Sequence, residues 1–63
     1  MPISNIPKNM VELAYDHEVR RTKLAILFDF GDKQAWIPES QIHELFDDSV
    51  IIPEWLAEDK GLI

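Results

Sequence analysis

The sequence predicts a small β-rich domain of the α+β class: an antiparallel meander or barrel of three to five strands that ends in a short C-terminal helix. Three observations predict it. Apolar and polar residues alternate over residues 10–19, and large apolar residues recur at every second position over residues 23–30, which is the period of a strand. Gly31 follows the second run, where a hairpin turn is expected. Pro53 and Gly61 carry the start and stop signals of a helix.

Length and composition restrict the protein to one domain. Of the 63 residues, residues 1–9 are expected to be an irregular lead-in and residues 10–63 a single domain. Because cysteine is absent, neither a disulfide framework nor a thiolate metal site is expected. A hydrophobic content of 46% is too high for a disordered chain. No apolar run reaches the roughly 20 residues that span a bilayer, and no signal peptide is recognised, so we expect a cytoplasmic protein.

The first alternating segment, residues 10–19, is interpreted as a half-buried strand. One face of that strand would carry the odd-numbered residues Val11, Leu13, Tyr15, His17 and Val19. A helix that begins after Pro7 is the alternative, since residues 10–14 also suit an apolar helix face. Residues 20–22 either turn or continue the strand.

The strongest strand signal lies at residues 23–30, where Leu24, Ile26, Phe28 and Phe30 share one face. Because Ala25 and Leu27 make the opposite face apolar as well, both faces are expected to be at least partly covered. Residues 31–33 are predicted to form a hairpin turn in which Gly31 adopts a positive φ. Residues 34–37 form the return strand.

The remaining elements are short. Residues 38–42 are predicted to form a turn or a single helical turn that Ser40 could cap, and residues 47–49 a second turn. An apolar strand at residues 50–52 precedes the terminal helix, whose first residue is expected to be Pro53. Trp55, Leu56 and Leu62 are expected to dock this helix onto the sheet.

Neither histidine predicts a metal or catalytic site. His17 lies between Asp16 and Glu18, but adjacent strand residues point to opposite faces, so both acids cannot support it locally. His43 precedes Glu44, and the two histidines match no metal motif. Ser40 near His43 lacks the glycine-rich elbow of a nucleophile. We therefore expect no enzyme activity, no metal and no cofactor.

Charge is the stronger functional signal. The formal net charge is −6, with +1 over residues 1–28 and −7 over residues 29–63. The acidic residues flank the turns and end the helix: Asp29, Asp32, Asp47, Asp48, Glu58 and Asp59. If they share one side, they would imitate the phosphates of a nucleic acid and bind a basic surface on another protein. The alternative is that acids gather at turns because turns are exposed.

Two other surface features carry weaker hypotheses. Trp36 either fills the core beneath the terminal helix, which we favour, or serves as an anchor for a partner; Trp55 is likewise expected in the core. Arg20, Arg21 and Lys23 form the basic cluster. Beside an aromatic strand, this cluster could bind single-stranded nucleic acid as OB-fold modules do. Ion pairing with the acidic half, or with a dimer mate, is the favoured interpretation.

Three segments carry a resemblance to known proteins: KLAILF at residues 23–28, WIPESQI at residues 36–42 and PEWLAEDKGL at residues 53–62. In this order they resemble a group of small uncharacterised phage and prophage proteins. The resemblance covers residues 23–62 and implies a mobile-element origin near replication or recombination functions. It implies no catalytic residue. Glu39 stands where these proteins commonly carry a basic residue, which would weaken a nucleic-acid contact there.

The sequence therefore leads to a non-catalytic interaction protein of a phage or mobile element. Its acidic face would inhibit a host nucleic-acid-handling or defence protein by mimicking nucleic acid. The expected partner is a host or phage protein with a basic surface, not a nucleic acid or a membrane. A homodimer is plausible because a small barrel leaves uncovered edge strands. The alternative is a small OB-like accessory domain that binds nucleic acid through Arg20, Arg21 and Lys23.

Overall fold

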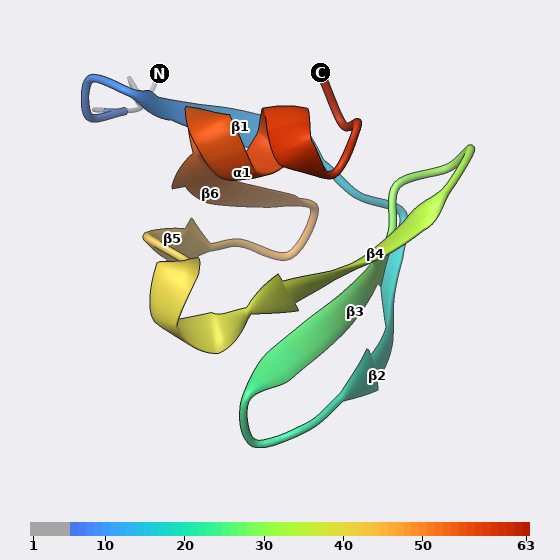
Figure 1. The fold of residues 1–63 in the computed structure, drawn as a ribbon. Coiled ribbons are helices and arrows are strands. Elements are labelled where there is room, and N and C mark those ends of the chain that lie inside the picture. Colours follow the sequence, from blue (N-terminus) through green and yellow to red (C-terminus); the bar gives the residue numbers. More distant parts are fainter. Residues whose placement is uncertain (1–5) are drawn as a thin grey trace.

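Two three-stranded antiparallel sheets and one short helix make up the fold in the computed structural model, which describes residues 6–63 (Figure 1). The elements are β1 (Met10–Ala14), β2 (His17–Arg21), β3 (Ala25–Asp29), β4 (Gln34–Pro38), a 3₁₀ turn (Glu39–Gln41), β5 (Glu44–Leu45), β6 (Ser49–Pro53) and α1 (Glu54–Asp59). The predicted β-rich class with a C-terminal helix is confirmed. The sheets remain open and do not close into a barrel. Of the predicted lead-in, residues 1–5 lie outside the described residues.

The sheet β2-β3-β4 is the meander that the sequence predicted. The β3–β4 hairpin pairs Ile26 with Ile37 and Leu27 with Trp36, so residues 31–33 form the expected turn. Gly31 adopts a φ of 104°, a region that side chains disfavour. The Asp29 carboxylate accepts a hydrogen bond from the Gly31 N–H at 2.8 Å, which holds the turn closed.

The other sheet has the order β1-β6-β5, with β6 in the middle. All five residues of β6 are buried, which agrees with the apolar run Val50-Ile51-Ile52 at the centre of this strand. β1 pairs with β6 through Val11 and Ile52, and β5 pairs with it through Leu45 and Val50. The sequence did not predict β5, because a strand of two residues is too short to show a period.

The prediction of a single strand over residues 10–19 is wrong, because the chain changes sheets at Tyr15 and Asp16. At this corner the Tyr15 N–H donates at 3.1 Å to the carbonyl of Asp48, which precedes β6 of the β1-β6-β5 sheet. The next N–H, that of Asp16, donates at 2.6 Å to the carbonyl of Asp29 in the β2-β3-β4 sheet. The alternating pattern therefore continues through a corner that joins the two sheets.

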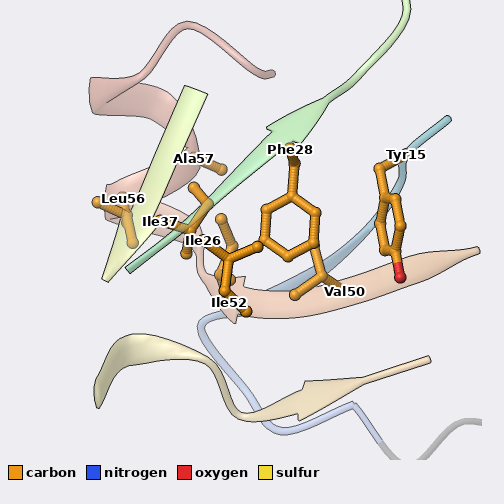
Figure 2. Close-up of a cluster of buried hydrophobic side chains, with 8 residues drawn as sticks. All are labelled: Tyr15, Ile26, Phe28, Ile37, Val50, Ile52, Leu56 and Ala57. Atoms are coloured by element: carbon orange, nitrogen blue, oxygen red, sulfur yellow. The ribbon is translucent and has the colours of Figure 1, made fainter. Parts of the chain in front are cut away.

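The hydrophobic core lies between the two sheets (Figure 2). The Phe28 ring is fully buried, and the Tyr15 ring lies against it with 4.6 Å between the centroids. Aliphatic side chains from both sheets and from α1 surround it: Ile26, Ile37, Val50, Ile52, Leu56 and Ala57. Burying each large side chain contributes about 1.5–3 kcal/mol, so this cluster is the main source of stability.

α1 packs against β6 and β1 of the β1-β6-β5 sheet. The helix begins one residue later than predicted. Pro53 is the last residue of β6 and the N-cap, so the helix itself starts at Glu54. Gly61, at a φ of 72°, ends the helix as expected: its N–H donates to the Glu58 carbonyl, and the Leu62 N–H donates to the Ala57 carbonyl. The predicted cap at Ser40 is wrong, since Pro38 is the N-cap of the 3₁₀ turn and makes no side-chain cap bond.

Two apolar residues expected to be buried are exposed. Leu24 is 78% exposed because it lies in the β2–β3 turn and not in β3. The Thr22 hydroxyl shapes this turn by accepting hydrogen bonds from the N–H groups of Leu24 and Ala25. Trp55 is 59% exposed, because the side of α1 that packs on the core carries Leu56 and Ala57.

No helix within residues 6–63 is long and apolar enough to cross a membrane.

Candidate interaction surface at the acidic end

The structure brings the predicted acidic residues to one end of the molecule, because the turns that carry them meet there (Figure 1). Asp47 and Asp48 form the β5–β6 turn, which bonds to the β1–β2 corner through the Asp48 carbonyl and the Tyr15 N–H. The corner bonds in turn to Asp29, which enters the β3–β4 turn with Asp32. The Lys33 ammonium in that turn donates to the Lys60 carbonyl at 2.8 Å, beside Glu58 and Asp59 at the end of α1.

Sequence reasoning missed one member of this group. Asp16 lies at the β1–β2 corner, with its backbone bonded to that of Asp29. Nothing in the local sequence signals this proximity, because it depends on which strands β2 and β6 pair with. We define the acidic end by the seven carboxylates of Asp16, Asp29, Asp32, Asp47, Asp48, Glu58 and Asp59. Six of these are exposed, and Asp29 is half-buried.

Most of the net charge of the protein lies at the acidic end. Its seven carboxylates and the two lysines beside them, Lys33 and Lys60, give a net charge of −5 out of −6 for the whole chain. Among residues 6–63, neither lysine forms an ion pair. The remainder of the molecule is close to neutral. The electric field outside the protein is therefore strongly one-sided.

The pKa of the buried Tyr15 phenol is affected by this charge. Burial of the phenol raises its pKa above 10.0, and the nearby carboxylates of Glu18, Asp47 and Asp48 raise it further. The hydroxyl donates a hydrogen bond to the Phe46 carbonyl at the start of the β5–β6 turn. The neutral phenol therefore helps to fix the acidic turn to the core.

A second feature of the acidic end is a compact group of possible metal ligands. One ligand atom each from Asp16, His17 and Asp29 can be chosen so that all three lie within 4.8 Å of one another. The His17 Nδ1 and an Asp16 carboxylate oxygen are 3.2 Å apart. His17 faces Asp29 across the β2–β3 pair, which explains why two residues 12 positions apart in sequence meet. His43 is exposed and belongs to no such group among the described residues.

The outer face of the sheet β2-β3-β4 places Trp36 where a partner could reach it. Trp36 is 38% exposed, so the prediction of a core tryptophan is wrong. The reason is the β3–β4 register: Ile26, Phe28, Ala35 and Ile37 take the inner face, and Trp36 takes the opposite one. Leu27 pairs with Trp36 on one side and with Arg20 on the other. We call Arg20, Leu27 and Trp36 the outer row.

The basic cluster is divided by ion pairs within the protein. Arg21 pairs with Glu18 at 3.1 Å and with Glu39 at 3.5 Å. Only the Glu39 pair reaches the acidic half of the sequence, as the favoured interpretation of this cluster expected. Both pairs are largely exposed, so each contributes about 0–1 kcal/mol. Within the described part of the chain, Arg20 and Lys23 form no ion pair. These two, rather than Arg21, are the cations available to a ligand.

Comparison with known proteins gave no further guide: no family model, curated protein or solved structure matches the chain significantly.

Proposed function

We propose that this protein is a non-catalytic interaction domain whose acidic end binds a basic, nucleic-acid-binding surface on another protein. The observation that carries the proposal is the meeting of three turns and the end of α1 at one place, which gathers a net charge of −5. Charge gathered in this way steers a basic partner towards one end of the molecule and raises the rate of association.

The distribution of the carboxylates over several elements is compatible with mimicry of a nucleic acid. Alternate residues on one strand face are about 6.6 Å apart, and phosphates along one strand of duplex DNA are about 3.4 Å apart along the axis. Because the carboxylates come from three turns and from the end of α1, their spacing is not restricted to the repeat of one strand. The resemblance to phage and prophage proteins supports a host nucleic-acid-handling or defence protein as the partner, which this domain would inhibit.

A capture experiment with matched charge variants tests the proposal. The untagged domain, coupled to a resin through its amino terminus, is exposed to host lysate, and captured proteins are eluted first with duplex DNA and then with salt. The test variant is Asp47→Asn/Asp48→Asn, which removes two charges from the acidic end. The control is Glu44→Gln/Glu54→Gln, which removes two exposed charges outside it.

We expect one basic nucleic-acid-binding protein to be captured by the wild type and by the control and to be released by duplex DNA. Capture by the test variant should fall at least about tenfold, since close charge pairs across an interface each contribute more than 1 kcal/mol. Equal capture by both variants would contradict the proposal, and so would a partner that DNA does not displace.

The outer row favours a second candidate, a domain that binds single-stranded nucleic acid. An exposed tryptophan and an arginine on the same sheet face can stack a base and contact a phosphate. Trp36 and Arg20 provide this pair, with Leu27 between them. Retardation of a labelled oligonucleotide at low salt that is lost in Arg20→Ala and in Trp36→Ala, but kept in Arg21→Ala, would favour this candidate over the acidic end.

A further inference from the structure

We propose that Asp16, His17 and Asp29 form a surface site for a divalent transition-metal ion at the end of the β2–β3 pair, next to the corner where the chain changes sheets. The three residues come from two segments: Asp16 from the β1–β2 corner with His17, the first residue of β2, and Asp29 from the end of β3. Their ligand atoms lie within 4.8 Å of one another. Asp16 and Asp29 also belong to the acidic end that is proposed to bind a protein partner. The metal site differs from that surface because it requires the His17 imidazole as well as carboxylates.

The distances suit direct ligation. Zn²⁺ binds nitrogen and carboxylate oxygen at about 2.0–2.2 Å, so neighbouring ligands of a tetrahedral site are about 3.4 Å apart. His17 Nδ1 and the Asp16 oxygen already lie 3.2 Å apart. The three ligand atoms lie within 4.8 Å of one another, so the group would have to contract when an ion binds. One Asp29 oxygen accepts the Gly31 N–H, which leaves the other oxygen for the ion. The metal ion would take the place of the contact between His17 Nδ1 and the Asp16 carboxylate.

Backbone bonds hold the two segments together before any ion arrives. The Asp16 N–H donates to the Asp29 carbonyl at 2.6 Å, and His17 is the register partner of Asp29 in the β2–β3 pair. Little conformational entropy is therefore lost when the side chains converge on an ion. The bound ion would link Asp16 and the first residue of β2 to the last residue of β3, and so stabilise the end of the β2–β3 pair at which the chain enters this sheet.

The charge around the site also points to a cation. Asp16 and Asp29 bring two negative charges close together, and no lysine or arginine of residues 6–63 forms an ion pair with either of them. The other carboxylates of the acidic end add to the negative potential. A divalent cation is the ligand that neutralises both carboxylates at once. Because an imidazole nitrogen is included, Zn²⁺, Co²⁺ or Ni²⁺ fits the ligand set better than Ca²⁺ or Mg²⁺, which prefer oxygen ligands.

The test uses the full chain without an affinity tag. Zn²⁺ binding is measured by calorimetry and by the shift in Tm, with Ca²⁺ as the comparison ion. The ligand variants are His17→Ala and Asp29→Asn, of which the second keeps an acceptor for the Gly31 N–H. Two controls separate ligation from general attraction: His43→Ala removes the other exposed histidine, and Asp47→Asn removes one charge from the acidic end outside the cluster.

We expect Zn²⁺ in excess of its Kd to raise the Tm of the wild type by about 5 °C or more. His17→Ala and Asp29→Asn should each weaken binding at least about tenfold. The two controls should bind Zn²⁺ as the wild type does. In nuclear magnetic resonance spectra, Co²⁺ should broaden the amide signals of residues 16, 17 and 29 most strongly.

Three outcomes would overturn the proposal. The first is a wild type that binds Zn²⁺ no better than Ca²⁺. The second is an equal loss of affinity in His17→Ala and His43→Ala. The third is an equal loss in Asp29→Asn and Asp47→Asn, which would show that the ion is attracted by the charge of the acidic end and not held by these ligands. Circular dichroism of each variant establishes that the fold is retained.

Discussion

At the scale of single residues, Tyr15 links the core to the acidic end. Its ring packs on Phe28, its hydroxyl donates to the Phe46 carbonyl, and its N–H donates to the Asp48 carbonyl. The ring contact reaches β3 in the core, and the two hydrogen bonds reach the β5–β6 turn. These surroundings favour the neutral phenol, because a buried phenolate would lose its hydration and would be repelled by the nearby carboxylates.

The raised pKa of Tyr15 predicts alkaline destabilisation. Tyrosine in the unfolded chain ionises near pH 10.0, and the folded protein holds its proton to a higher pH. The stabilisation from Tyr15 is therefore fully present below pH 10.0 and is lost as the pH rises through the folded pKa. Because Tyr15 is the single tyrosine of the chain, the ultraviolet absorbance of tyrosinate reports its titration directly. A folded-state midpoint at or below that of a denatured sample would contradict the prediction.

The different burial of Phe28 and Trp36 predicts different costs of truncation. Phe28→Ala leaves a cavity in a fully buried site and should cost about 3–5 kcal/mol in the free energy of unfolding. For 63 residues the total is about 3–9 kcal/mol, so much of this variant should be unfolded. Trp36→Ala should cost about 1 kcal/mol or less. Urea unfolding followed by circular dichroism measures both. Similar costs would show that Trp36 supports the core.

At the scale of elements, α1 depends on its surroundings. A helix of six residues is unstable alone, so it forms because Leu56 and Ala57 are buried and because Gly61 ends it. Lys60, the C-cap residue of α1, also connects the helix with the β3–β4 turn, because its carbonyl accepts a hydrogen bond from the Lys33 ammonium. The helix end thus joins the core to the acidic end.

Gly61→Ala should destabilise the protein by about 1–2 kcal/mol. Alanine is strained at a φ of 72°, and its Cβ would lie 2.8 Å from the Lys33 Nζ. Since the Lys33 side chain can move, backbone strain is expected to cause most of the loss. Gly61→Asn is the matched control: it adds the same Cβ, but asparagine tolerates positive φ and should cost less. Thermal unfolding distinguishes them, and equal costs would assign the loss to the contact with Lys33.

At the scale of the whole molecule, the carboxylates of the acidic end repel one another in the folded state. Seven carboxylates with two nearby lysines stay close only because the sheets and α1 hold their turns together. Charge that opposes folding persists at functional surfaces, where it serves binding and not stability. Because the remainder of the protein is nearly neutral, this electrostatic repulsion is confined to the acidic end.

Relieving the repulsion should stabilise the fold. We expect Asp47→Asn to raise the free energy of unfolding by about 0.5 kcal/mol, and added salt to raise the Tm of the wild type more than that of this variant. Glu54→Gln is the control with the opposite sign: Glu54 lies in the first turn of α1, where its charge is favourable, so its loss should lower stability slightly. A lower Tm in salt for the wild type would contradict the prediction.

Local signals predicted much of the fold. Gly31 was predicted to adopt a positive φ and Gly61 to end the helix, and both predictions are confirmed. The β3–β4 hairpin and the C-terminal helix followed from patterns within a few residues. The corner at Tyr15 could not be predicted, since its alternating pattern is the same in a straight strand and in one that changes sheets.

The candidate sites show the same division. The acidic residues were identified individually from their types and their positions at turns. Their meeting at one end depends on contacts between β1, β3 and β6, which are distant in sequence. The cluster of Asp16, His17 and Asp29 depends on the β2–β3 register, which is shifted by an irregularity between Glu18 and Arg20. No local pattern encodes such a shift.

The sequence alone determined the β-rich class, the hairpin, the terminal helix and the excess of acid, because each arises from neighbouring residues or from composition. The tertiary structure decided which faces are covered: it exposed Trp36, buried Tyr15 and gathered the carboxylates at one end. The physical reason is that strand pairing and sheet packing join residues far apart in the chain. A side chain's surroundings are set by these distant partners, and not by its sequence neighbours.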